Sequence, residues 1–169
     1  MNKVNFTPIQ KLLTQPITNH WLVDGYIERK SLNMLFGEPG TCKSFLAMEL
    51  ALCVSAGLDW YGRPVQKGHV VYIAGEGKSG IQKRFLALQD KYKHLIQDIV
   101  ISDSPAELTN EDCVQQLLSD LQNYKQQPSL IIIDTMHRNF GTGDENSSKD
   151  IGIFIKHLDQ LKNNTDAAI

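Results

Sequence analysis

Short apolar runs and longer amphipathic segments alternate along the chain. The runs SLNMLF (31–36), HVVYIA (69–74), IVIS (99–102) and SLIIID (129–134) have apolar residues at consecutive positions. Strands buried on both faces, as in a parallel sheet, show this pattern. We therefore predict four strands at these places.

Helices are predicted between these runs. KSFLAMELALCVSA (43–56) is apolar around most of its surface, and Gly57 is suited to end it. Thr109 and Asp112 resemble a capping box that opens a helix to about residue 124. A last helix is predicted over 150–161. In residues 79–95, apolar side chains recur at helical spacing at Ile81, Phe85, Leu88, Tyr92 and Leu95.

Strands alternating with helices predict an α/β fold, a parallel β-sheet flanked by helices on both faces. Ligands of such folds bind at the carboxyl ends of the strands. Three candidate stretches follow strands there: GEPGTCKS (37–44), GEG (75–77) and DT (134–135). Residues 1–20 are polar, with Pro8 and Pro16, and are predicted to form an arm or linker before a domain over 21–169.

Composition narrows the class of protein. A chain of 169 residues is long enough for one domain. Its net charge of -2 gives no overall positive electrostatic field that would attract DNA or an acidic membrane. No apolar run approaches the roughly 20 residues that span a bilayer, and the N-terminus does not resemble a secretory signal. The three cysteines are scattered, which disfavours disulfides and zinc. We expect a cytoplasmic protein without a membrane partner.

GEPGTCKS matches the phosphate-binding pattern G-x-x-x-x-G-K-[ST] at Gly37, Lys43 and Ser44. In such a loop, backbone N–H groups and a helix N-terminus surround the phosphates. Lys43 would neutralise charge on the β- and γ-phosphates, and the Ser44 hydroxyl would bind Mg²⁺. The alternative is a glycine turn that only begins a helix.

Cys42 stands where the pattern has glycine. A side chain there costs about 1–2 kcal/mol if the backbone is left-handed, which nucleotide affinity can offset. The replicative MCM helicases and the MoxR ATPases are similar here, with G-x-P-G-x-A-K-[ST], so we expect the loop to tolerate Cys42. Two roles stay open for it: a small filler, or a reactive thiol whose oxidation blocks the nucleotide.

Two carboxylates follow predicted strands. Asp134 ends LIIID, where it could hold the Mg²⁺ shell through water. Thr135 follows it, where many ATPases have a catalytic glutamate, so the base must come from elsewhere. Glu76 is the candidate, since its strand opens onto the same crevice and it could activate the attacking water. Either carboxylate could instead belong to an ordinary turn.

The order of these motifs resembles the RecA-like ATPases of the plasmid and phage RepA-type replicative helicase family. The resemblance lies in W-L-V-x-G…L-x-x-L-x-G-x-P-G-x-[G]-K-S-F-L-A from Trp21 to Ala47, in VVYIAGEG, in a helix with Arg84, in aspartate followed by threonine, and in GDENS (143–147). It covers about residues 20–169.

The resemblance implies a RecA-like P-loop NTPase core that uses ATP and Mg²⁺, forms a hexamer at full length, and acts on single-stranded DNA. It gives Lys43, Glu76 and Asp134 catalytic roles, and Ser44 and Asp134 the metal. The residues expected at the nucleotide are Gly37, Glu38, Pro39, Gly40, Thr41, Cys42, Lys43, Ser44, Phe45 and Arg84.

The chain departs from the family at its end. LKNNTDAAI looks like a helix, a turn and the first residues of a strand, and the family's C-terminal strands are lacking. In the family that strand pairs beside the P-loop strand. We therefore expect an apolar edge at 31–36 that is either covered or paired with another chain.

Three functions remain open: a RepA-like helicase motor, a nucleotide-binding regulatory or assembly module with little hydrolysis, and a small-molecule P-loop kinase. The kinase ranks last, because the chain has no arginine-rich lid. The loop NFGTGDENSSKD (139–150) is weakly charged and is as well explained by a loop that closes on itself as by contact with DNA.

Overall fold

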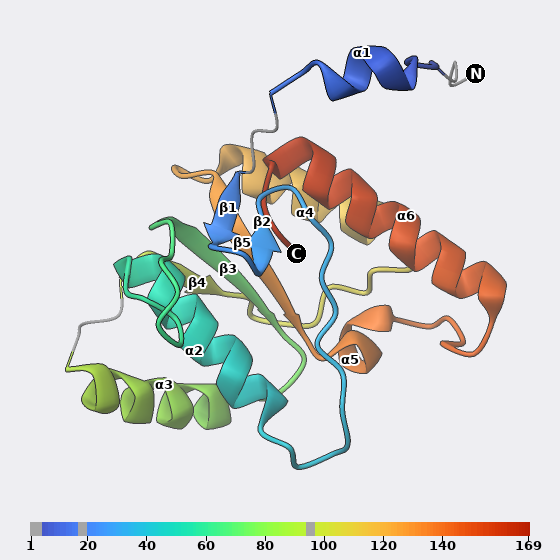
Figure 1. Cartoon of the computed structure of the whole chain (residues 1–169). Coiled ribbons are helices and arrows are strands. Elements are labelled where there is room, and N and C mark those ends of the chain that lie inside the picture. Colours follow the sequence, from blue (N-terminus) through green and yellow to red (C-terminus); the bar gives the residue numbers. More distant parts are fainter. Residues whose placement is uncertain (1–4, 17–19, 94–96) are drawn as a thin grey trace.

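The computed structural model describes residues 5–16, 20–93 and 97–169 (Figure 1). The helices are α1 (Ile9–Leu13), α2 (Lys43–Ala56), α3 (Lys78–Tyr92), α4 (Glu111–Asn123), α5 (Met136–Phe140) and α6 (Ser148–Thr165). The strands are β1 (Trp21–Val23), β2 (Ile27–Glu28), β3 (His69–Ala74), β4 (Ile99–Ile101) and β5 (Pro128–Asp134). Within the described residues, no helix is long and apolar enough to cross a membrane.

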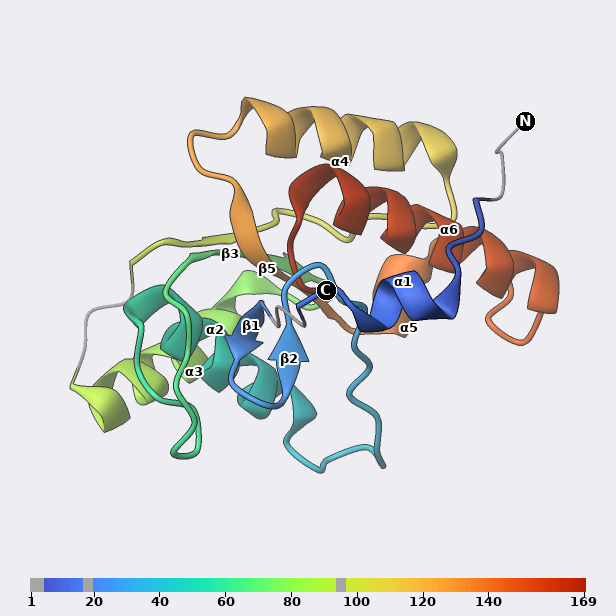
Figure 2. The ribbon, with the colours of Figure 1, turned by 45° about the horizontal axis from the view of Figure 1, so that its top comes forward.

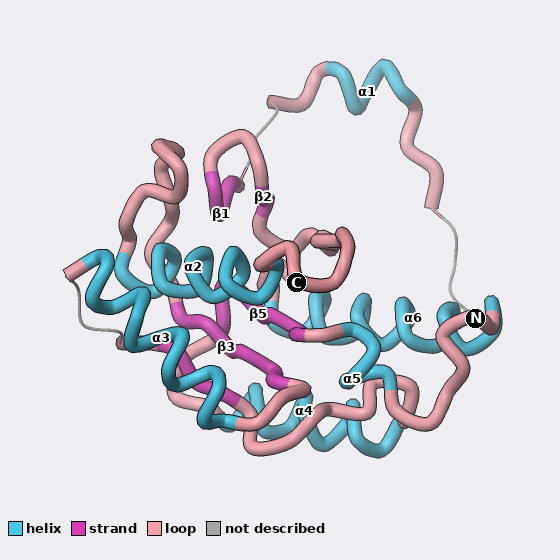
Figure 3. Tube along the Cα trace, turned by 90° about the horizontal axis from the view of Figure 1, so that it is seen from below, coloured by secondary structure: helices cyan, strands magenta, loops and turns pink. Residues whose placement is uncertain are grey.

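The centre of the fold is a parallel sheet in the order β4-β3-β5. All six residues of β3 are buried, because helices cover both faces of the sheet. Figure 3 shows β3 and β5 between α2 on one side and α4 on the other. The α/β fold with a parallel sheet between helices is thereby confirmed.

Each face has its own apolar core. Tyr72 and Leu130 face α2 and α3, where they pack with Met48, Leu52 and Phe85. On the opposite face α4 and α6 pack side by side, as Figure 2 shows. The core there is formed by Val71, Ile73, Ile131, Leu118, Phe154 and Leu158.

Several predicted bounds agree with the structure. α2 begins at Lys43 and ends at Ala56, and the left-handed Gly57 follows as its C-cap and donates its N–H to the Cys53 carbonyl. α3 ends at Tyr92, and Leu95 of the predicted helix lies outside the described residues. The N-terminal residues 1–4 and 17–19 of the predicted arm also lie outside them. The short helix α1 in that segment has no buried side chain.

The predicted cap of α4 was wrong by one residue. Asn110 is the N-cap, and its side chain accepts hydrogen bonds from the backbone of Asp112 and Cys113. Thr109 instead donates its hydroxyl to the Phe140 carbonyl at 2.6 Å. This tertiary contact ties the loop before α4 to α5, which local pattern could not reveal.

The predicted strand over residues 31–36 is not a regular strand. Only its first half pairs: Ile169 donates to the Ser31 carbonyl at 2.9 Å, and Asn33 donates to the Ile169 carbonyl at 2.7 Å. Past that point Met34 and Phe36 are 73% and 82% exposed. The strand is therefore wrong because neither a neighbouring strand nor a helix covers its second half.

Residues 167–169 occupy the position beside β5. Ile131 donates to the Ala168 carbonyl at 2.8 Å, and Ala168 donates to the Ser129 carbonyl at 3.0 Å, in parallel register. Ile169 then bonds to segment 31–36. The end of the chain thus lies between β5 and the segment before the loop, as expected of an incipient strand.

Candidate active site

The loop GEPGTCKS joins segment 31–36 to α2. Gly40 has a φ of +80°, and Cys42 has φ +61° and ψ +24°, which is left-handed backbone. Cys42 is the N-cap of α2, and no described side chain caps the helix. The first N–H groups of α2 are therefore available to an anion, which the positive end of the helix dipole also favours.

Lys43 lies within the curve of this loop. Its ammonium donates hydrogen bonds to the carbonyls of Gly37, at 2.7 Å, and Glu38, at 2.9 Å. Thr41 also donates its hydroxyl to the Glu38 carbonyl, at 2.8 Å. These contacts hold the loop curled around a positive charge at the N-terminus of α2.

Asp134 at the end of β5 joins the loop to the sheet. Its Oδ1 accepts a hydrogen bond from the Ser44 hydroxyl at 3.0 Å. Its Oδ2 accepts one from the Tyr72 hydroxyl at 2.5 Å. Burial and the bond to Asp134 raise the pKa of Tyr72 far above its usual value. Two residues predicted separately, Ser44 and Asp134, are thus in direct contact.

Tyr72 was missed in the sequence. It is fully buried in β3, and its ring packs edge-on against Phe85 of α3. The available signal was a tyrosine among the aliphatic residues of HVVYIA, because a buried phenol needs a hydrogen-bond partner.

Glu76 and Arg84 form a third part of the site. Their side chains are 3.5 Å apart, and the Arg84 guanidinium lies 5.8 Å from the centroid of the Phe45 ring. Phe45 is on α2, directly after Ser44, so Arg84 of α3 faces the loop. Gly75 holds the end of β3 against β5 through an N–H to the Asp134 carbonyl at 2.7 Å.

The close approach of β3 to α5 explains the glycine before Glu76. A Cβ at Gly75 would lie 2.2 Å from the Cβ of Arg138. A side chain at this position would collide with Arg138, so only glycine fits directly before Glu76. The contact of Ser44 with Asp134, and those of Arg84 with Glu76 and Phe45, therefore bring the loop together with the ends of β3 and β5.

The chemistry of this edge suits a nucleotide with a divalent cation. Lys43 and the uncapped N-terminus of α2 offer donors to phosphate oxygens. Ser44 and Asp134 offer the oxygen ligands that Mg²⁺ prefers. The side chains present therefore fit both Mg²⁺ and a nucleoside triphosphate.

Comparison with known proteins agrees with this geometry. Residues 2–169 match a protein family described as an AAA domain. The chain belongs to this AAA domain family. It is also 22% identical, over 151 residues, to "DNA repair and recombination protein RadB" of Methanobrevibacter smithii. That similarity covers 88% of this chain and 61% of RadB, so the chain spans about three fifths of that relative.

The family match and the parallel sheet between helices are together consistent with a RecA-like P-loop core. The resemblance to RepA-type helicases stays a prediction. The roles assigned above to individual residues stay predictions that rest on the geometry.

The loop over 139–150 is closed by its own side chains. Asp144 Oδ1 accepts the backbone N–H of Asn146, and Asp150 Oδ2 accepts that of Asp144. His137 contacts Glu145 at 3.1 Å. These short-range contacts match the self-closing interpretation, and contact with DNA stays a prediction.

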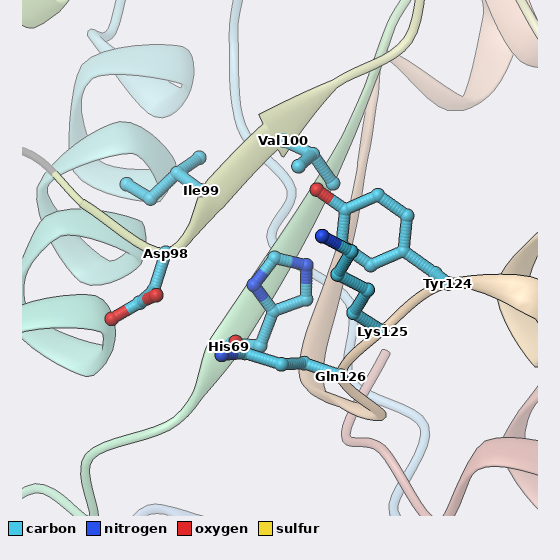
Figure 4. Close-up of a pocket in the computed structure, with 7 residues that line it drawn as sticks. All are labelled: His69, Asp98, Ile99, Val100, Tyr124, Lys125 and Gln126. Atoms are coloured by element: carbon cyan, nitrogen blue, oxygen red, sulfur yellow. The ribbon is translucent and has the colours of Figure 1, made fainter.

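A small cavity of about 220 Å³ lies at the opposite, amino end of the sheet (Figure 4). His69 is 7% exposed and stacks on Tyr124, with ring centroids 5.1 Å apart. Neither ring nitrogen has a partner among the described residues. Burial lowers the pKa of His69, although the nearby Asp98 acts in the opposite direction. This cavity is separate from the predicted nucleotide site.

Proposed function

We propose that this domain binds Mg-ATP and hydrolyses it as the motor domain of a RepA-like hexameric DNA helicase in plasmid or phage replication. The observation that carries the proposal is the contact of Ser44 with Asp134 at 3.0 Å beside the loop that encloses Lys43. In a P-loop ATPase these are the metal-binding hydroxyl, the carboxylate of the metal shell and the phosphate-binding lysine.

Each side chain has a distinct task in this proposal. Lys43 would exchange its bonds to the loop carbonyls for oxygens of the β- and γ-phosphates. Ser44 would bind Mg²⁺ directly, and Asp134 would hold it through water. When bound, Mg²⁺ neutralises charge on the phosphates. Arg84, over the Phe45 ring, would lie beside the nucleotide.

Glu76 is the proposed general base. Its side chain is 54% exposed, and its carboxylate lies 3.5 Å from the Arg84 guanidinium, so the side chain is accessible to water. It would accept a proton from the water that attacks the γ-phosphate in line. Thr135, directly after Asp134, has a hydroxyl that is not basic enough for this role, and its side chain caps α5 by accepting the Arg138 N–H.

Action on DNA is supported by the resemblance to RepA-type helicases and by the relative RadB, whose name states a role in DNA repair and recombination. A finger residue from a neighbouring subunit would complete the site in a hexamer. The alternative function is a nucleotide-binding switch with little hydrolysis. It is favoured by the bonds that already engage Lys43 within the loop.

The test compares Mg-ATP binding and turnover of the wild type and Glu76→Gln, with and without single-stranded DNA. Loss of a general base lowers turnover by about 100-fold or more, so Glu76→Gln should bind ATP but hardly hydrolyse it. Glu28→Gln, at an exposed glutamate on β2, is the matched control and should behave as wild type. Binding without turnover in the wild type, indifferent to DNA, would instead support the switch.

A further inference from the structure

Tyr72 lies where its hydroxyl can reach the end of the neighbouring strand. In the parallel register Tyr72 is opposite Ile132, and Ala74 is opposite Asp134. Side chains alternate between the faces of a strand, so Asp134 is on the same face as Ile132, two residues further along. A long side chain at 72 spans this diagonal, and its oxygen comes within 2.5 Å of Asp134 Oδ2.

The Asp134 carboxylate is therefore held from two sides. Ser44 of α2 donates to Oδ1, and Tyr72 of β3 donates to Oδ2. With one donor the carboxylate could rotate about its Cβ–Cγ bond, whereas two donors on different elements fix its plane. Each oxygen keeps lone pairs for further partners.

The donor itself is fixed in place. Tyr72 is fully buried, and its ring is packed edge-to-face with Phe85 at 6.0 Å between centroids. Packing of this kind leaves the phenol few alternative positions. In the described part of the chain, Asp134 is the hydrogen-bond partner of its hydroxyl.

We propose that Tyr72 is a positioning residue that orients the Asp134 carboxylate toward the Mg²⁺ shell. The inference rests on the proposed function, since it gives Asp134 the metal. It concerns the affinity for Mg²⁺ rather than for the nucleotide, because the Tyr72 hydroxyl bonds to Asp134, whereas Lys43 bonds to the carbonyls of Gly37 and Glu38.

The first experiment uses Tyr72→Phe, which removes one oxygen and keeps the ring. Nucleotide binding is measured without Mg²⁺ and across a Mg²⁺ titration, and turnover is measured over the same titration. A hydrogen bond to a charged group corresponds to about a tenfold change in an equilibrium constant. For Tyr72→Phe, we expect the Mg²⁺ concentration that gives half-maximal turnover to rise about tenfold. Nucleotide binding without Mg²⁺ should be unchanged, and saturating Mg²⁺ should restore turnover.

Tyr92→Phe is the matched control. The Tyr92 hydroxyl also bonds to a carboxylate, that of Glu49 at 2.5 Å, but on the α2–α3 contact away from the loop. It should leave the Mg²⁺ titration unchanged. A purely structural role of Tyr72 would lower thermal stability and the amount of active protein without moving the Mg²⁺ midpoint, and this result would overturn the proposal.

A second measurement needs no variant, in case Tyr72→Phe does not fold. In wild-type protein labelled at the tyrosine ζ-carbon, the Tyr72 resonance should move when Mg²⁺ is added to the nucleotide-bound protein, while that of Tyr92 should not. An unmoved Tyr72 resonance in a protein that binds Mg-ATP refutes the positioning role alone. A wild type that does not bind Mg-ATP refutes the proposed function, and the inference with it.

Discussion

Replacing Cys42 by glycine should stabilise this protein, although glycine usually weakens a helix end relative to a polar cap. Cys42 has φ +61° and ψ +24°, a conformation in which a Cβ crowds the backbone. Its side chain is exposed, and its sulfur is 4.0 Å from the Gly40 carbonyl, so little contact is lost on substitution. The change in stability should therefore come mainly from relief of backbone strain at position 42.

Two opposing contributions set the change in the free energy of unfolding on Cys42→Gly. A non-glycine residue in left-handed backbone costs about 1–2 kcal/mol. Glycine gives the unfolded chain extra freedom, which opposes folding by about 0.4–1 kcal/mol. The net gain in the free energy of unfolding lies between about 0 and 1.6 kcal/mol, centred near about 0.8 kcal/mol. For a domain of this size that is a rise of about 2 °C in Tm.

Urea unfolding of wild type, Cys42→Gly and Cys42→Ala measures this directly. Cys42→Ala removes the thiol and keeps the Cβ, so its stability should equal that of wild type. A Cys42→Gly protein no more stable than Cys42→Ala would refute the reasoning, because the Cβ would then carry no strain. If nucleotide binding also requires this backbone, Cys42→Gly should bind ATP at least as tightly as wild type.

Two further predictions concern stability and association. Burial lowers the pKa of His69, so below about pH 6.5 the unfolded chain binds a proton more readily than the folded chain, and the free energy of unfolding falls as pH falls. In urea unfolding, His69→Phe, which keeps a ring against Tyr124, should lose less of this free energy between pH 7 and 5 than wild type. Equal losses in the two proteins would contradict the prediction. Segment 31–36 exposes apolar side chains, and its backbone is only partly paired, so the chain should self-associate as the protein concentration rises. Phe36→Ser should reduce this association in sedimentation velocity, whereas Phe6→Ser, at a 91% exposed position in the N-terminal segment, should not; a wild type that stays monomeric would contradict the prediction.

The sequence predicted the sheet well where burial alone decides the pattern. HVVYIA and SLIIID are apolar on both faces because helices cover both faces, and they form β3 and β5. SLNMLF has the same pattern but is not a regular strand, because its partner is the backbone of Ile169 at only two positions. Periodicity records which side chains could be buried, and only a neighbouring chain segment decides whether they are.

At the site, too, the sequence pattern does not show which side chains become neighbours in the fold. Lys43, Ser44, Glu76 and Asp134 were predicted because phosphate and metal chemistry requires those residue types in such loops and at strand ends, and their roles stay predictions; the structure shows the contact of Ser44 with Asp134 and that of Glu76 with Arg84. Tyr72 could not be found this way, because its contact depends on the register between two strands that are far apart in sequence. A shift of that register by one residue would place the phenol on the opposite face. The orientation of the Asp134 carboxylate therefore depends on the pairing of β3 with β5 as much as on the loop. Substitutions that loosen the β3–β5 register should impair Mg²⁺ binding even when every residue of GEPGTCKS is intact.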